Sequence, residues 1–327
     1  MNYIKSLLQL PNKSSSIKSL LKVVVPKKVY IGIVNYINKD NTIRIYTNNR
    51  TVTIDSKVKN PNGFALVAYW DGKPNFGDLI GPYLISKITN RPVLNIINES
   101  YSGFITVGSI LQSVDRKDMV VWGSGFIEEP SDKTLNNIKK YNPLILSLRG
   151  KKTAECLVNA NVKLPDNVVY GDPALILPLF YQPLVNSHKR VGVCPHFIHK
   201  PHFLEIINKD DSLNIIDVQK DMESVVSEIA SSSVCISTSL HGLIIAQAYN
   251  IPWVWLEIDD QNLFGNDFKF KDFFSTLREE QVTHIKVKIE DVKDLDYVAL
   301  AKQASLPEKL YNEELILRSL KEYLSID

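Results

Sequence analysis

The sequence has 327 residues and is 44% hydrophobic, so the chain is long enough to bury at least one full core and to form two ordinary domains. Its 38 Lys and Arg residues nearly balance its 36 Asp and Glu residues, and the net charge of +2 excludes the strongly basic signature of nucleic-acid binders. The three cysteines, Cys156, Cys194 and Cys235, lie far apart and form no Cys-x-x-Cys pair, which favours buried reduced thiols.

Signals for a membrane span or for export are weak in this sequence. Polar residues and Pro252 interrupt the best apolar run, residues 243–258, so no run reaches the roughly 18 residues that a membrane-spanning helix needs. The N-terminus lacks the charged start, apolar core and small-residue cleavage site of a secretory signal. We therefore expect a cytoplasmic protein.

Residues 1–28 form a basic arm with six lysines, no acidic residue and apolar residues at helical spacings. Two interpretations stay open: peripheral contact with an anionic membrane at its inner face, or a tail that packs on the folded domain. Further on, residues 29–34, 42–47 and 51–55 alternate or are β-branched between Asn-rich turns, which predicts a small hairpin or meander. We expect residues 1–62, arm and hairpin together, to be an appendage outside the core.

From residue 63 onward, short apolar strands alternate with helical segments, which is typical of parallel α/β layers. The first series of predicted strands comprises residues 64–70, 93–96, 104–107, 119–122, 144–148 and 168–170. After a Pro-rich break, for which we expect a linker at residues 178–188, the second series comprises residues 190–194, 213–218, 234–237 and 253–256. The pattern predicts two tandem Rossmann-like domains, residues 63–183 and 184–306, that face each other across a cleft, and a final helix within residues 307–327 that packs back.

Ligands of open parallel sheets bind at the carboxyl ends of the strands, so residues that directly follow strands are the first functional candidates. Asn75, Gly77 and Asp78 follow the first strand; Asn75 and Asp78 are good helix caps, yet the whole loop is more polar than capping requires. Gly123 and Ser124 lie in a turn that brings backbone amides close to a ligand.

Three charged or titratable residues follow later strands. The planar guanidinium of Arg149 suits a carboxylate or phosphate, although a surface ion pair would also explain it. Asp172, before Pro173, is fully explained as a helix cap and stays a secondary candidate, as does the turn residue His196.

The segment Ser237-Thr238-Ser239-Leu240-His241-Gly242 carries the strongest signal. It joins a strand to an apolar helix, so hydroxyls and amides at the helix N-terminus predict an anion site in which His241 can move a proton. Lys269 lies among aromatic residues further on and can supply a second cation. The remaining histidines have no metal-like spacing with His241, so we expect no metal. We also expect no organic cofactor.

Tandem α/β domains also suit a glycosyltransferase with a nucleotide-sugar donor. Retaining enzymes of that class commonly place a glutamate on the helix after the glycine, where it accepts hydrogen bonds from ribose. Gln247 stands at that place here, which removes the charge and weakens this alternative. A third alternative, a non-catalytic sugar-binding protein, would not need Arg149 and His241 together.

The ordered set of motifs over residues 64–277 resembles the polysaccharide pyruvyltransferase family. The matching pieces are Asn75-Phe76-Gly77-Asp78, Trp122-Gly123-Ser124-Gly125, Leu148-Arg149-Gly150 with Thr153, Gly171-Asp172-Pro173-Ala174, Ser237 to Gly242, and Lys269. The resemblance implies a glycosyltransferase-B-like fold and transfer of pyruvate from phosphoenolpyruvate to a sugar diol of a surface polysaccharide or its lipid-linked precursor.

The resemblance further implies that Arg149, His241 and Lys269 contact the phosphate and carboxylate of phosphoenolpyruvate. Ser237, Ser239 and Gly242 would complete the donor site. As a hypothesis, His241 is the acid and Asp78 the base toward the sugar hydroxyl, or the two roles are reversed. Residues 1–62 match nothing in the family pattern, so they give no information about the acceptor.

Overall fold

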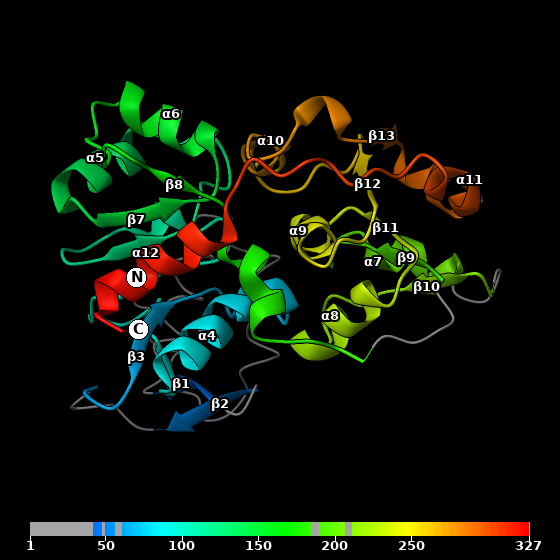
Figure 1. Cartoon of the computed structure of the whole chain (residues 1–327). Coiled ribbons are helices and arrows are strands. Elements are labelled where there is room, and N and C mark those ends of the chain that lie inside the picture. The colour runs from blue at the N-terminus through cyan, green and yellow to red at the C-terminus, as the bar shows by residue number, and fades with distance from the viewer. Residues whose placement is uncertain (1–41, 48–49, 56–60, 185–189, 207–210, 327) are drawn as a thin grey trace, which may run out of the picture. The chain divides into compact units, whose positions relative to one another are not determined.

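The computed structural model describes residues 42–47, 50–55, 61–184, 190–206 and 211–326, and it is a mixed α/β structure with two sheets (Figure 1). The larger sheet has eight strands in the order β2-β1-β4-β3-β5-β6-β7-β8. These strands are β1 (Thr42–Thr47), β2 (Arg50–Asp55), β3 (Ala65–Ala68), β4 (Val93–Asn95), β5 (Phe104–Ile105), β6 (Val120–Trp122), β7 (Leu144–Leu148) and β8 (Val169–Tyr170).

The smaller sheet has five strands, all parallel, in the order β10-β9-β11-β12-β13. They are β9 (Val191–Cys194), β10 (Leu213–Ile215), β11 (Val234–Ser237), β12 (Trp253–Ile258) and β13 (His284–Val287). The predicted strands at residues 144–148 and 234–237 coincide with β7 and β11. Strand β13 was not predicted, because its side chains alternate between exposed and half-buried positions and include His284 and Lys286.

Helices connect the strands, as the alternating pattern predicted. The α-helices are α4 (Phe76–Thr89), α5 (Asp132–Tyr141), α6 (Lys151–Asn159), α7 (Lys200–Phe203), α8 (Met222–Ala230), α9 (Leu240–Ala248), α10 (Phe268–Phe274), α11 (Tyr297–Ala301) and α12 (Glu313–Leu324). The 3-10 helices are η1 (Leu111–Ser113), η2 (Pro173–Leu179), η3 (Leu204–Ile206), η4 (Glu279–Gln281) and η5 (Ile289–Asp294).

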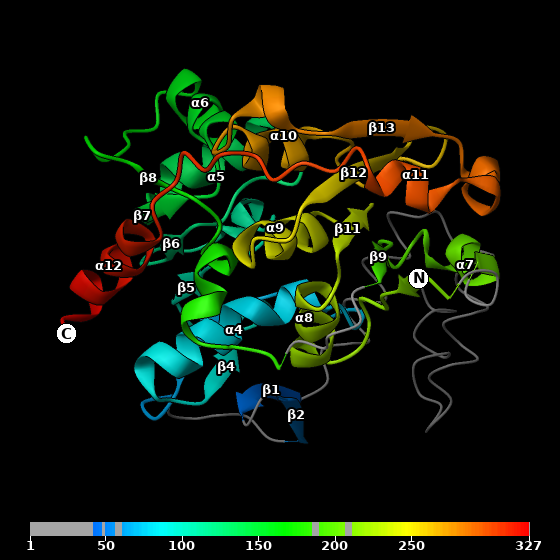
Figure 2. The same ribbon diagram turned by 45° about the vertical axis from the view of Figure 1, so that its right-hand side comes forward.

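Strands β3 to β8 pair in parallel, and their side chains are mostly apolar and buried, because helices cover parallel sheets on both faces. Figure 2 shows α9 beside β11, the strand that precedes it, and the two are in contact. The α/β class with parallel sheets is thus confirmed. The division into two Rossmann-like domains and the cleft between them stay predictions.

The expectation that the N-terminal hairpin is an appendage was wrong. Strand β1 pairs antiparallel with β4 through Ile45 opposite Leu94 and Tyr46 opposite Val93. Tyr46 is buried in the same hydrophobic core as the parallel strands. The hairpin therefore satisfies backbone groups that β4 would otherwise expose at the sheet edge. The predicted strand at residues 29–34 and the basic arm at residues 1–28 lie outside the described residues.

The final helix α12 packs against β7, β8 and η2, so the chain returns from the smaller sheet to the larger one. Its anchor is the indole of Trp122, whose Nε1 donates to the carbonyl oxygen of Ile316 at 2.9 Å. Ile316 itself is fully buried. None of the described helices combines the length and the apolar character that crossing a membrane requires.

Candidate functional site

The start of α4, just after the turn that follows β3, packs against His241 of α9. Asn75 caps α4 by accepting a hydrogen bond from the Gly77 amide at 3.4 Å, and its Nδ2 donates to Asp78 Oδ2 at 3.0 Å. A methyl group at Gly77 would overlap the imidazole of His241, so only glycine lets the ring lie against the start of α4. Cε1 of the same ring lies near Gly108, in the loop after β5: a Cβ added at Gly108 would be 3.8 Å from it.

The segment Ser237 to Gly242 forms the predicted strand-to-helix turn, but two of its members serve the turn itself. Ser237 Oγ accepts from the Ser239 amide at 3.0 Å and donates to the Cys194 carbonyl at 2.8 Å. Gly242 lies so close to the Ser237 side chain that a Cβ would overlap it, which lets α9 pack tightly on β11. Ser239 is the N-cap of α9 and makes no side-chain capping bond, so its hydroxyl remains for a ligand.

His241 is a buried imidazole, only 9% exposed, and its Nε2 has no hydrogen-bond partner among the described residues. Burial, together with the positive charges of Arg149 and Lys269, lowers its pKa to about 3. The ring is therefore neutral at physiological pH, with one nitrogen able to accept or donate a proton. An unpaired buried polar atom is costly and is typical of a site that meets a ligand.

Lys269 on α10 is a second buried polar group, 8% exposed. Burial lowers the pKa of its ammonium to about 8, the Arg149 charge acts in the same direction, and Asp78 opposes both. No carboxylate of the described residues lies within ion-pair distance of Lys269 Nζ. A buried cation without a counterion favours binding of an anion.

Asp78 is coupled to Lys269 by charge. Burial raises the pKa of Asp78 to about 7, against the opposing effects of the Asn75 hydrogen bond and of Lys269. At neutral pH a part of the Asp78 carboxyl population is therefore protonated. Asp78 thus lies in the first turn of α4, His241 in the first turn of α9 and Lys269 in α10, and the charge of Lys269 acts on both Asp78 and His241.

His196 belongs to the same electrostatic group. Burial lowers its pKa to about 3, followed by the charges of Lys269, His199 and His241. His199, which the sequence analysis did not select, is buried and fixed at both ring nitrogens: Nδ1 lies 3.0 Å from Thr238 Oγ1 and Nε2 lies 2.8 Å from the Gln261 carbonyl oxygen. It holds Thr238 in place, which in turn accepts from the His196 amide at 2.8 Å.

Arg149 is fully buried, and its guanidinium group donates hydrogen bonds to other protein atoms. Nε donates to Asp272 Oδ2 at 2.8 Å, Nη2 donates to the Phe126 carbonyl at 2.6 Å, and Nη1 donates to Ser109 Oγ. The structure therefore shows Arg149 in an ion pair, and it is a buried pair instead of the surface pair considered above. Its charge still lowers the pKa of both His241 and Lys269.

Asp272, like His199, was missed by the sequence analysis. Besides Arg149, its carboxylate accepts from the Thr153 amide and from Thr153 Oγ1, both at 2.8 Å, at the start of α6. The spacing of Lys269 and Asp272, three residues apart on one helix, could have placed them on the same face. Asp272 thereby holds α10, and with it Lys269, against α6.

The secondary candidates shape the backbone around Arg149. Gly123 has a φ of +76° and lies against Pro173, so a side chain there would be strained and would overlap the proline ring. Ser124 Oγ donates to the Gly108 carbonyl at 3.0 Å. Asp172 caps η2 through the Ala174 amide at 2.9 Å, as expected, and burial raises its pKa to about 6.

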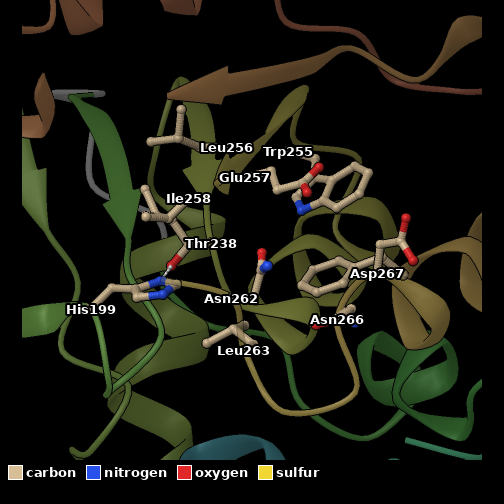
Figure 3. A pocket seen from close by; sticks show the side chains of 11 residues that line it. His199, Thr238, Trp255, Leu256, Glu257, Ile258, Asn262, Leu263, Asn266 and Asp267 are labelled. Carbon is tan, nitrogen blue, oxygen red and sulfur yellow. Dashed lines mark hydrogen bonds between the residues drawn. The ribbon is translucent and has the colours of Figure 1, made fainter. Parts of the chain in front are cut away.

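A small pocket opens beside Thr238 and His199 (Figure 3). Trp255 and Phe270 form its apolar wall, Asn262 also lines it, and its empty volume is about 280 Å³, part of it open to solvent. The space that the centre of a water molecule can occupy in it is only about 20 Å³, which is roughly room for one water molecule. Among the described residues, no group of three or more His, Cys, Asp or Glu side chains is arranged to hold a metal ion.

Comparison with known proteins gives one family. The family model of polysaccharide pyruvyl transferases matches residues 16–260, a range that includes Asp78, Arg149 and His241 and ends before Lys269. An uncharacterized protein of Acanthamoeba polyphaga mimivirus is 28% identical over 221 residues, which are 64% of this chain and 73% of that protein.

Two further proteins are similar to this chain. The succinoglycan biosynthesis protein ExoV of Rhizobium meliloti is 27% identical over 225 residues, 64% of this chain and 64% of ExoV. The solved structure of an uncharacterized protein from Klebsiella pneumoniae aligns with a TM-score of 0.44 and 14% identity, over 69% of this chain and 94% of that protein.

Proposed function

The chain belongs to the polysaccharide pyruvyl transferase family, and on that premise we propose that it transfers pyruvate from phosphoenolpyruvate to two hydroxyls of one sugar, forming a ketal. The acceptor is a glycan of a surface polysaccharide or its lipid-linked precursor, in keeping with the similarity to a succinoglycan biosynthesis protein. One observation carries the proposal: the buried ammonium of Lys269 acts by its charge on His241, whose Nε2 has no hydrogen-bond partner among the described residues.

The donor is small and carries up to three negative charges, so several cationic groups must converge on it. Lys269 supplies a direct ion pair, and the N-terminus of α9 with the Ser239 hydroxyl supplies hydrogen bonds for the phosphate. Arg149 contributes its positive charge through its effect on His241 and Lys269. Ser237 and Gly242 keep the turn in the conformation that presents the amides of α9.

The pKa values favour one assignment of the two proton transfers. Asp78, with a pKa near 7, holds a proton that it can give, whereas His241, with a pKa near 3 in the ligand-free protein, is neutral. The negative charge of bound phosphoenolpyruvate favours the protonated imidazole and so lets His241 accept a proton. We assign Asp78 as the acid that protonates the methylene carbon of phosphoenolpyruvate. His241 is the base that takes the proton of the attacking sugar hydroxyl and passes it to the phosphate.

The reaction balances without a metal or an organic cofactor. The methylene carbon gains a proton and becomes a methyl group, while one sugar oxygen bonds to the central carbon. The carbon–oxygen bond to phosphate then breaks, and the second sugar oxygen bonds to the same carbon. Of the two hydroxyl protons, one replaces the proton spent by Asp78 and the other leaves with hydrogen phosphate.

The alternatives have less support. In the nucleotide-sugar alternative, position 247 would contact ribose, but Gln247 is buried, donates to the Pro307 carbonyl at 3.0 Å and accepts from Trp253 Nε1 at 2.9 Å. The amide nitrogen and the amide oxygen of Gln247 are therefore both used in hydrogen bonds within the core. A non-catalytic sugar-binding protein would have no use for a buried cation and a neutral histidine in one place.

The test is a direct assay with donor and acceptor. The protein is mixed with phosphoenolpyruvate and, in separate reactions, methyl galactosides, glucosides or N-acetylmannosaminides, and both phosphate release and a new ketal methyl signal in the NMR spectrum are followed. We expect both signals with at least one sugar, in equal amounts. Release of UDP from UDP-sugars, or no product from either donor, would overturn the proposal.

A further inference from the structure

Trp70 differs from the other tryptophans of the chain. It is 54% exposed, whereas Trp122, Trp253 and Trp255 are buried. It directly precedes the loop of residues 71–75 that leads from β3 into α4 and so into Asp78. A large aromatic side chain at the carboxyl end of a parallel strand lies where ligands of such sheets bind.

The backbone around Trp70 is held in place on both sides. The buried side chain of Asn95 donates through Nδ2 to the Tyr69 carbonyl at 3.0 Å and to Asp71 Oδ2 at 2.8 Å, and its Oδ1 accepts from the Tyr69 amide at 3.3 Å. The six-membered ring of Trp70 lies against Gly72, where a Cβ would overlap it. The indole is thus fixed against the loop while more than half of its surface meets solvent.

The loop of residues 71–75, which directly follows Trp70, reaches the candidate site at two points. The charge of Asp71 acts on Asp78. Lys73 Nζ lies 5.4 Å from the ring centroid of Phe197, and that ring lies 4.3 Å from the ring of His196. Trp70 therefore lies at the start of the same loop, residues 71–75, that leads to Asp78 near His241.

We propose that Trp70 is the stacking platform for a pyranose ring of the acceptor glycan, an inference that rests on the proposed function. One face of a pyranose presents C–H groups that pack on an aromatic face, while its hydroxyls stay at the edge. Phosphoenolpyruvate has no ring to stack, so the platform serves the acceptor alone. A preorganised indole lowers the entropy cost of binding a flexible glycan.

Acrylamide quenching of tryptophan emission tests the platform without any turnover. Because the other three tryptophans are buried, the quenchable emission comes from Trp70, and the Trp70→Phe variant, which removes it, is the control. Methyl galactoside, glucoside and N-acetylmannosaminide are titrated in the absence of phosphoenolpyruvate. We expect at least one sugar to reduce quenching of the wild-type protein; unchanged quenching with every sugar would overturn the inference.

Kinetics with the sugar that accepts pyruvate provide the second measurement. Trp70→Ala should raise the KM for the sugar by about five- to tenfold, the effect of one lost stacking contact, and leave the KM for phosphoenolpyruvate unchanged. Trp70→Phe should retain most of the affinity. Tyr323→Ala, which removes another exposed aromatic side chain, on α12, is the matched control and should change neither KM.

The two proposals fail separately. If the wild-type protein transfers no pyruvate, the proposed function is wrong, and the effect of the sugars on acrylamide quenching still decides whether Trp70 binds a glycan. If pyruvate is transferred and Trp70→Ala has the wild-type KM for the sugar, the platform is wrong and the proposed function stands. Circular dichroism of each variant confirms that the fold is intact.

Discussion

Arg149 Nε lies 2.8 Å from Asp272 Oδ2, and neither side chain has any surface exposed to solvent. The pair joins the turn after β7 to α10, and Asp272 also accepts two hydrogen bonds from Thr153 at the start of α6. It therefore fixes the helix that carries Lys269. A charge inside protein is stabilised only by such partners, so the pair is sensitive to the loss of either member.

Replacing either member of this pair alone should destabilise the protein strongly. Asp272→Asn or Arg149→Met leaves one buried charge unpaired and should lower the free energy of unfolding by about 3–5 kcal/mol, measured by urea denaturation. The double variant Arg149→Met with Asp272→Leu should lose less than the sum of the two single changes.

The exposed pair of Arg278 and Glu308 is the control for this prediction, at 3.0 Å with both side chains about half exposed. Arg278→Met should change the free energy of unfolding by less than about 1 kcal/mol. Equal losses at the exposed and the buried pair would show that Asp272 has no special structural role.

The Gly77→Ala substitution should reduce turnover although it removes no chemical group. The added methyl would overlap the His241 ring and displace it from the start of α4. We expect kcat to fall by at least about 100-fold, comparable with the loss of one general base in His241→Ala. Gly63→Ala, whose methyl would meet nothing within 4 Å, is the control and should retain wild-type kcat.

Lys269→Met should weaken binding of the donor specifically. Loss of a charge-assisted interaction of about 1.5–3 kcal/mol corresponds to a rise of about 10- to 150-fold in the KM for phosphoenolpyruvate. The KM for the sugar should stay constant. Lys271→Met on the same helix is the matched control, because Lys271 is half exposed and pairs with Asp267 at 2.6 Å; a similar loss there would mean that α10, not the buried ammonium, is responsible.

The activity should fall as the pH rises through about 7. Asp78 acts as an acid and has a pKa raised to about 7, so it carries its proton below that pH and loses it above. Lys269, with a pKa lowered to about 8, then loses its charge and adds a second decline. The measurement is the pH dependence of kcat/KM for phosphoenolpyruvate, which reports groups of the free enzyme and substrate.

The Lys269→Arg variant separates the two declines. Arginine keeps its charge at all of these pH values, so only the decline near pH 7 should remain. The donor phosphate titrates equally in both proteins and therefore cancels in the comparison. Activity that rises with pH through 7 would instead make Asp78 the base and reverse the assignment of the two proton transfers.

Local sequence patterns were sufficient to predict strands such as β7 and β11, the helix caps, and the segments that carry the site residues. The apolar runs of β7 and β11 define their own ends, and Asn75 and Asp172 cap the helices that the sequence predicted for them. Such signals are local, because a buried strand and a helix cap depend on residues a few positions apart. Asp78, His241 and Lys269 were selected in this way, each as a residue next to a strand or within a helix.

The tertiary structure alone decided which of these residues meet, and in which protonation state. Nothing near Arg149 in the sequence indicates that its partner is Asp272, which lies 123 residues away. Nothing near Tyr46 indicates that β1 completes the edge of a sheet built from later strands. The lowered pKa of His241 and the raised pKa of Asp78 come from burial among distant residues, because desolvation depends on every segment that excludes water from a side chain.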